Sequence, residues 1–374
     1  MILALRELRR RPGRFATAGV ILTLIAVLLM FLGGLLDGLI QASTGAVRAQ
    51  DADVIVYSDN AQASLARSRI EPEVRETIEL LSAVTEVGGL GVVQLGARVP
   101  DAGPRDLAGV ALFGYELAPT GVPDTPADGE VYADEVLRAD GVEAGMELLL
   151  GPARSPVTVI GFVSDTSFNG QGALWASPAT WRDVLDANRP DARVSGEVFQ
   201  ALVVRGDAEP DDLAAMIDRI TAEYHTASAT RSLSVPDAVN AIPGVEEQQG
   251  TFNQIIGVTI VIALVVIALF FSLITVERAG LYGVLKALGA RSSTIFAGLV
   301  AQAVVVTLIA SSIAAALTIA LDAALPPGSL PLAVSADRII TSVLLLLVAA
   351  VVGCSFSLRR VLRIDPASAI GSSS

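Results

Sequence analysis

Four long apolar runs dominate the pattern of hydrophobic and polar positions along the chain. Each contains at least 20 residues without a formal charge. At about 1.5 Å per residue, a helix of this length spans roughly 30 Å, the thickness of a bilayer core. We therefore expect four transmembrane helices. They cover residues 15–36, 255–276, 295–321 and 339–358.

The first run has a second interpretation, because Arg6, Arg9, Arg10 and Arg11 precede it as in a signal peptide. Its 22 apolar residues exceed a normal signal-peptide core, and no A-x-A cleavage site follows directly. The sequence favours a retained membrane anchor over a cleaved signal.

The long segment after the first run has the composition of a mixed α/β domain. Strand patterns occupy residues 53–57, 157–163 and 200–204, and amphipathic helices begin at Pro72 and near Asp211. A helical stalk is expected from about Val235 into the second apolar run, interrupted at Pro243-Gly244.

Charge predicts the orientation of these elements. Residues 1–14, 277–294 and 359–374 together hold eleven Arg or Lys against three acids, whereas the remainder holds fifteen against thirty-six. The positive-inside rule then places both termini and the loop after the second helix in the cytoplasm. The net charge of −13 belongs mainly to the extracytoplasmic part, and a nucleic-acid-binding surface is excluded.

Several kinds of chemistry are missing from the sequence. Cys354 and His225 are the only residues of their types, so an intramolecular disulfide, a histidine-based triad and a multi-histidine metal site are excluded. The only lysine, Lys286, lies outside any G-x-x-x-x-G-K-[ST] pattern. We expect no catalytic or metal-binding residue, and any ATPase must be another polypeptide.

The loop between the second and third apolar runs carries a helical stripe. Leu281, Val284, Leu285 and Leu288 fall at i, i+3, i+4 and i+7, Gly289 suits a left-handed C-cap, and Ser292 or Ser293 can cap the next helix. Periodicity leaves two interpretations open: the helix lies on the lipid surface, or it enters a groove on a cytoplasmic partner.

The motif E-R-x(7)-K-A-L-G-A-R in this loop resembles the loop between the second and third membrane helices of MacB/FtsX/LolC-type (type VII) ABC transporter permeases. Three further segments resemble that family: A-L-R-E-L-R-R-R-P-G-R-F near the N-terminus, G-E-V-Y-A-D-E-V with the strands after it, and a closing D-P-x-x-A. Gly33-Gly34-Leu35 and the final A-I-G resemble the DevC and HrtB exporter branch.

The resemblance implies a homodimer of this permease that works with two copies of a separate cytoplasmic ABC ATPase, which carries ATP and Mg. It also implies mechanical transmission from that ATPase through the loop, and it makes haem a possible substrate. The chain itself is expected to hold no cofactor. The implied ATPase-coupling residues are Glu277, Arg278, Leu281, Leu285, Lys286, Leu288 and Gly289.

Four residues near the expected outer membrane surface are candidate substrate contacts. Asp37 and Met30 lie seven positions apart and share a face of the first helix, while Glu246 and Glu247 precede the second. A methionine and a carboxylate could ligate haem. The alternatives are an interfacial acid for Asp37, a buried packing residue for Met30 and a solvated acidic stalk for the glutamates.

We therefore expect a four-helix (1+3) protein of the bacterial plasma membrane with a large extracytoplasmic α/β domain between helices 1 and 2. The expected function is the permease subunit of an exporter of amphipathic or hydrophobic molecules. One alternative is an FtsX-like permease that switches an extracellular partner, such as a cell-wall hydrolase, without transport; another is a membrane-anchored receptor. The expected segments are an amphipathic helix (1–14), helix 1 (15–39), the outer domain with its stalk (40–253), helix 2 (254–276), the coupling loop (277–294), helix 3 (295–321), an outer loop (322–337), helix 4 (338–358) and a cytoplasmic tail (359–374).

Overall fold

The computed structural model describes residues 12–362 apart from 101–102, 104–105, 195, 226–227, 278 and 325–329. Most of the expected N-terminal amphipathic helix, Arg278 and the closing D-P-x-x-A motif lie outside the described residues. The chain divides into two compact units. We call residues 1–37, 249–326 and 332–374 the helical unit, and residues 38–248 and 327–331 the α/β unit.

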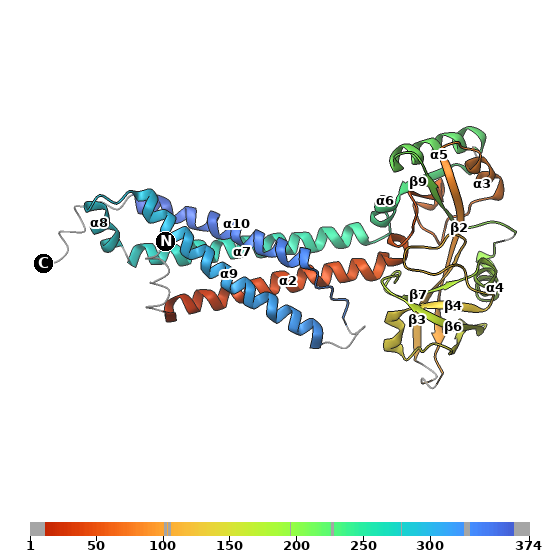
Figure 1. The fold of residues 1–374 in the computed structure, drawn as a ribbon, viewed down its shortest axis with the longest axis horizontal. Coiled ribbons are helices and arrows are strands. Elements are labelled where there is room, and N and C mark those ends of the chain that lie inside the picture. The colour runs from red at the N-terminus through yellow and green to blue at the C-terminus, as the bar shows by residue number, and fades with distance from the viewer. Residues whose placement is uncertain are drawn as a thin grey trace. The chain divides into compact units, whose positions relative to one another are not determined.

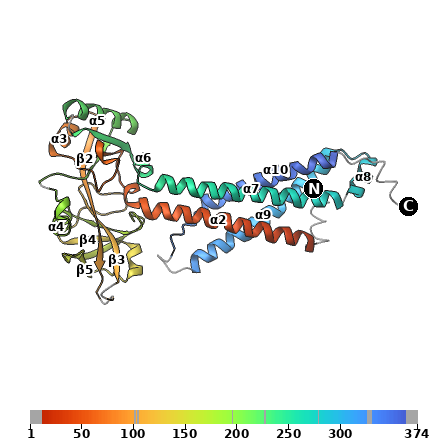
Figure 2. The same cartoon turned by 180° about the vertical axis from the view of Figure 1, so that it is seen from behind.

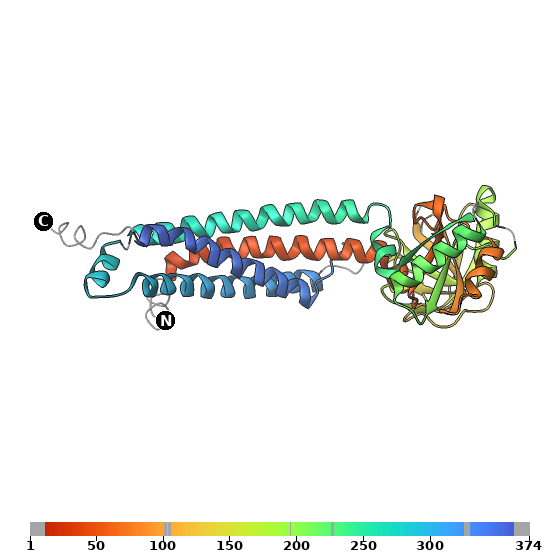
Figure 3. The same cartoon turned by 90° about the horizontal axis from the view of Figure 1, so that it is seen from above.

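The helical unit contains four helices long and apolar enough to cross a membrane, which confirms the expected 1+3 arrangement (Figure 1). They run side by side in the views of Figures 1 and 3. A short fifth helix, α8 (Ala279–Ala287), joins the second and third. The long helices are α2 (Pro12–Arg48), α7 (Val245–Glu277), α9 (Ser292–Ala324) and α10 (Ala336–Leu362).

Two of these helices extend well beyond the apolar runs that predicted them. Helix α2 ends at Arg48 rather than near residue 39, and α7 begins at Val245 rather than near residue 254. A hydrophobic run reports the thickness of a bilayer, whereas a helix continues as long as its backbone hydrogen bonds and packing persist. The extra turns belong largely to the α/β unit.

Small residues allow the long helices to approach closely. Ala26, Ala263 and Ala314, from three different helices, are buried in one cluster with Leu346. A Cβ atom on Gly353 would lie 3.0 Å from the Leu264 carbonyl oxygen of α7. Without a hydrophobic effect between helices in lipid, such close backbone contact is a main source of helix association.

The α/β unit is built on one nine-stranded mixed sheet with the order β3-β7-β4-β6-β5-β2-β8-β1-β9. The strands are β1 (Val54–Ser58), β2 (Val84–Arg98), β3 (Leu107–Tyr115), β4 (Glu130–Asp134), β5 (Glu147–Leu150), β6 (Ser155–Val163), β7 (Gly172–Ala176), β8 (Ala201–Gly206) and β9 (Thr230–Ser234). The predicted strands near residues 53–57, 157–163 and 200–204 correspond to β1, β6 and β8.

Strand β2 joins two parts of this sheet. Its second half pairs with β3, and this pairing closes β3-β7-β4-β6-β5-β2 into a ring. Its first half pairs with β8, which leads to β1 and β9. The domain is therefore one sheet with a closed part and an open part that share a 15-residue strand.

Helices cover the open part, as Figure 2 shows for α3 (Pro72–Glu79) and α5 (Pro210–Tyr224). Both faces of β1 are buried: Val54 and Val56 belong to one apolar cluster, Ile55 and Tyr57 to another. The second cluster also contains Val47 from α2. The expected stalk is α6 (Val235–Asn240), separated from α7 by Pro243 and by Gly244, whose φ is +90°.

Helix α4 (Pro178–Asn188) packs on the sheet through a fully buried tryptophan. Gly91 and Gly114, which are register partners on β2 and β3, lie beneath Trp181. A Cβ atom on Gly91 would come within 2.2 Å of the indole ring. The glycine pair thus provides the space that the indole occupies.

Candidate functional site

Helix α8 ends in a Schellman motif, as predicted for a glycine C-cap. The Gly289 amide donates to the Lys286 carbonyl at 3.0 Å, and the Ala290 amide donates to the Leu285 carbonyl at 2.9 Å. Gly289 has a φ of +92°, which L-residues rarely adopt. The two hydrogen bonds satisfy orphan carbonyls of α8 and fix the direction in which the chain leaves it.

The two faces of α8 have different surroundings. Tyr282 is only 7% exposed and belongs to the buried cluster that contains Phe271, Ile274 and Ile295. The predicted stripe lies on the other side, where Leu281 is 55%, Val284 46%, Leu285 37% and Leu288 80% exposed. Tyr282 therefore packs one face of α8 against the other helices, and the opposite face presents a row of exposed apolar side chains.

Charged residues flank this row. Glu277 is the last residue of α7, and Lys286 lies in the last turn of α8, where a cation interacts favourably with the helix dipole. Helix α9 begins at Ser292, which places Ser292 and Ser293 in its first turn rather than at the expected N-cap. The expected coupling residues that the structure describes therefore all lie between the end of α7 and the start of α9.

Asp37, a predicted substrate residue, forms a bidentate ion pair with Arg338 of α10. Arg338 Nε donates to Asp37 Oδ2 at 2.7 Å, and Arg338 Nη2 donates to Asp37 Oδ1. Both side chains are about one quarter exposed, Asp37 at 28% and Arg338 at 26%. In this state the carboxylate is occupied by an arginine, which favours a role in joining α2 to α10.

Gly33 leaves room for this ion pair. A Cβ atom on Gly33 would lie 2.6 Å from Arg338 Cδ, so the arginine stem crosses α2 where no side chain stands. The Ala333 amide donates to the Gly34 carbonyl at 3.0 Å. Ser335 Oγ caps α10 by accepting from the Arg338 amide at 3.1 Å. Arg338 was missed in the sequence, although an isolated cation beside an apolar run was a signal.

A double-mutant cycle tests the Asp37–Arg338 pair. Arg338→Gln and Asp37→Asn should each destabilise the protein, because each leaves a half-buried partner unpaired. The double variant should lose less than the sum, with a coupling of about 1–2 kcal/mol. Thermal unfolding of the four proteins in nanodiscs measures this coupling, and a value of zero would show that the pair contributes nothing.

The other predicted substrate residues have contrasting environments. Met30 is 2% exposed and packs in the cluster with Ala26 and Leu346, so it is not accessible in this state. Glu246 and Glu247 are exposed in the first turn of α7, where acids stabilise a helix N-terminus. Met30 and Asp37 therefore have different surroundings, Met30 in an apolar cluster and Asp37 in an ion pair with Arg338.

The last turns of α2 are held by the loop 165–171 of the α/β unit. The Asn169 and Gly170 amides donate to the Ser43 and Ala42 carbonyls at 3.1 and 3.0 Å, and the Ala46 amide donates to the Ser167 carbonyl. Asp165 pairs with Arg48 at 2.8 Å and also accepts from Gln41. We call this arrangement the α2 clamp.

Gly45 is required at the centre of the α2 clamp. A Cβ atom there would lie 2.8 Å from the Asp165 carbonyl oxygen and 2.9 Å from both the amide nitrogen and the carbonyl oxygen of Ser167. These are backbone atoms, so they cannot rotate away. The clamp therefore joins the last turns of α2 to the loop 165–171 through close backbone contacts.

Comparison with known proteins identifies similarity in the part of the chain that contains α8. Residues 253–366 match the family described as FtsX-like permease C-terminal. The putative hemin transport system permease protein HrtB of Staphylococcus haemolyticus is 19% identical over 99% of this chain and 99% of its own length. HrtB proteins of two Staphylococcus epidermidis strains are 23% and 25% identical over 38% and 35% of this chain, and 40% and 37% of their own lengths.

Two solved structures resemble the α/β unit only distantly. The periplasmic region of MacB from Actinobacillus actinomycetemcomitans gives a TM-score of 0.37 at 13% identity, covering 53% of this chain and 95% of that one. The extracellular domain of YknZ from Gram-positive bacteria gives 0.32 at 13% identity, covering 49% and 99%.

The sequence motifs, the 1+3 helices and the matched C-terminal family agree with one another. The predicted resemblance to MacB/FtsX-type ABC permeases is supported: residues 253–366 match the FtsX-like permease C-terminal family, and the chain is similar to HrtB over nearly its whole length.

Proposed function

We propose that this protein is the membrane-spanning subunit of an ATP-driven exporter, and that it acts as a homodimer with two copies of a separate cytoplasmic ATPase. The observation that carries the proposal is α8, a capped helix with an exposed apolar row inside an FtsX-like permease domain. The proposed orientation has both termini and α8 in the cytoplasm and the α/β unit outside. The charge distribution supports this orientation through the positive-inside rule.

The proposed role of α8 is to dock into a groove on the ATPase. An amphipathic helix binds a groove through residues at i, i+3, i+4 and i+7, which is the spacing of the exposed row. Glu277, Arg278 and Lys286 are proposed to set the register by charge. Tyr282 supports this role, because it secures the opposite face of α8 to the bundle and lets a push on α8 reach α7 and α9.

The α2 clamp offers a route from the helices to the sheet. Backbone hydrogen bonds and the Arg48–Asp165 pair attach the end of α2 to the loop 165–171. If α2 moved, the loop would therefore move with it, and α2 would not slide past the loop. This attachment supports mechanical transmission as the mode of action.

The proposed substrate is an amphipathic or hydrophobic molecule, and haem is one candidate because the related HrtB proteins bear hemin in their names. Met30 would need to leave its buried cluster, and Asp37 its ion pair with Arg338, before either could contact a substrate. Glu246 and Glu247 are exposed and remain candidate contacts. The alternative is an FtsX-like permease that activates an extracellular partner without transport.

The ATPase rate of the permease with its partner ATPase, reconstituted in lipid, tests the exporter. Haemin, a lipopeptide and an apolar drug are added in turn. We expect one class to stimulate hydrolysis saturably, about two- to fivefold, through preferential binding to one conformational state. Replacing Glu246 and Glu247 with alanine should weaken that response if they contact the substrate. Glu209→Ala, at the exposed N-cap position of α5, serves as the charge control because its side chain makes no capping hydrogen bond.

Hydrolysis that ignores every small molecule would contradict the exporter and favour the signalling permease. A purified extracellular partner would then be expected to change the ATPase rate. Failure to associate with any ATPase would contradict both and favour the membrane-anchored receptor.

A further inference from the structure

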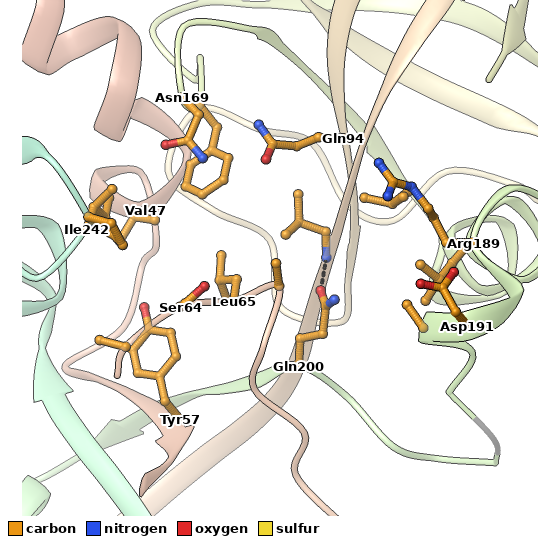
Figure 4. A pocket seen from close by; sticks show the side chains of 18 residues that line it. Val47, Tyr57, Ser64, Leu65, Gln94, Asn169, Arg189, Asp191, Gln200 and Ile242 are labelled. Carbon is orange, nitrogen blue, oxygen red and sulfur yellow. Dashed lines mark hydrogen bonds between the residues drawn. The ribbon is translucent and has the colours of Figure 1, made fainter. Parts of the chain in front are cut away.

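A pocket of about 340 Å³ opens in the α/β unit where the sheet changes partners along β2 (Figure 4). Strand β2 pairs with β8 up to Leu90 and with β5 only from Ala97. Among the described strands, none pairs with residues 91–96 on this side. The sheet therefore has a gap at its centre, and residues of β2 line it.

Some main-chain groups of β2 form hydrogen bonds at this gap. The Val92 amide donates to the Gln200 side-chain oxygen, and the Gly96 carbonyl accepts from the Gly151 amide at 2.9 Å. Alternate residues of an antiparallel strand direct their main-chain groups to the same edge. The main chain of Gln94 therefore faces the gap as well, and no described strand pairs with it there.

Apolar and polar side chains both line the pocket, and the charged side chains lie on one side of it. Val47, Tyr57 and Ile242 lie together on one side in Figure 4, and Arg189 and Asp191 lie on the other. Burial raises the pKa of Tyr57, which keeps its phenol neutral. Arg189 forms no ion pair with the residues that the structure describes, Asp191 included.

Backbone conformation adds a further observation. Ala63 and Asn169 line the pocket and have φ angles of +56° and +49°, in the left-handed region that non-glycine residues seldom occupy. Their conformations are held by the rest of the fold, and strain of this kind clusters at ligand sites. Asn169 also belongs to the loop that forms the α2 clamp.

We propose that this gap in the sheet is a binding site for a small amphipathic molecule with an anionic head. The apolar body contacts Val47, Phe168 and Ile242, and the head contacts the Arg189 guanidinium and the polar edge at Gln94. Arg189 is the one basic residue and Asp191 the one acid among the residues that line the pocket. Because Arg189 is not engaged by a described acid, its guanidinium can pair with an anionic head. A volume above 300 Å³ is typical of small-molecule sites.

The site contacts both chain segments that lead to the helices. Val47 lies near the end of α2, and Ile242 and Pro243 lie between α6 and α7. A ligand in the pocket therefore touches the α2 clamp and the α6–α7 link together. Binding itself is independent of the proposed transport function, so its failure and the failure of the exporter proposal are distinguishable.

Calorimetric titration of the full-length permease in nanodiscs with laurate tests the site, with empty nanodiscs subtracted. We expect saturable binding of one laurate per chain, with no saturable signal for dodecyltrimethylammonium because Arg189 repels its head. Arg189→Gln should weaken laurate binding about fivefold or more. Arg219→Gln, an exposed arginine on α5 outside the pocket, should leave binding unchanged.

A second variant tests the site by filling the pocket. Ala66 is exposed at the rim of the pocket, so Ala66→Trp should fill the site without disturbing the core and abolish saturable binding. An unchanged thermal unfolding curve confirms that this variant is folded. Laurate heats equal to those of empty nanodiscs, or full binding by Ala66→Trp, would overturn the proposal.

Discussion

Replacing both Leu285 and Leu288 with glutamate is expected to abolish co-purification of the partner ATPase. The two side chains belong to the exposed row of α8, so the change removes no contact of the bundle core. In the proposed complex, however, two carboxylates would enter an apolar groove without partners. A loss of about 3 kcal/mol, or at least 100-fold in affinity, is a conservative expectation.

A matched pair of substitutions separates docking from added charge. Ser293 and Thr294 are exposed in the first turn of α9, close in sequence to α8. Glutamates there introduce the same charge where a helix N-terminus tolerates it, and they should leave ATPase capture intact. Retention of the ATPase by the Leu285/Leu288 variant would show that α8 lies on the lipid surface instead.

Gly45→Val is expected to break the α2 clamp, at a cost of about 3 kcal/mol in the free energy of unfolding. The added Cβ would lie under 3.0 Å from backbone atoms of Asp165 and Ser167, so either the loop 165–171 or the end of α2 must move. Thermal unfolding and limited proteolysis of the loop would measure the effect. The partner ATPase should still bind, because α8 is unchanged. Its rate should no longer respond to substrate, because the proposed route from α2 to the sheet is broken.

Gly19→Val provides the control on the same helix. Gly19 lies near the other end of α2, and an added Cβ atom there has no described atom within 4 Å. Its effect should stay below about 1 kcal/mol, since valine is tolerated in a lipid-facing helix. Equal losses for Gly45→Val and Gly19→Val would mean that the clamp does not hold α2.

Local patterns were sufficient to predict the helices and the exposed row of α8. Uninterrupted hydrophobicity identifies a membrane helix because lipid requires it along the whole span. Leu281, Leu285 and Leu288 were placed on one face by spacing alone, and Gly289 by its conformational freedom. In each case the decisive interactions lie within a few residues of one another.

Long-range pairings could not be predicted from such patterns. Asp37 and Arg338 are 301 positions apart, and nothing near Asp37 in the sequence identifies its partner. Likewise, glycines in β2 and β3 gave no indication that a tryptophan on α4 would lie over them. The gap along β2 depends on where β8 and β5 end, which only the assembled sheet reveals.

The two segments that lead from the sheet to the long apolar helices differ in helical continuity. Helix α2 is uninterrupted from Pro12 to Arg48, whereas Gly244, with its φ of +90°, separates α6 from α7. Continuous backbone hydrogen bonds therefore link the apolar part of α2 directly to the turns that the loop 165–171 contacts, whereas the backbone direction changes at Gly244 before α7 begins.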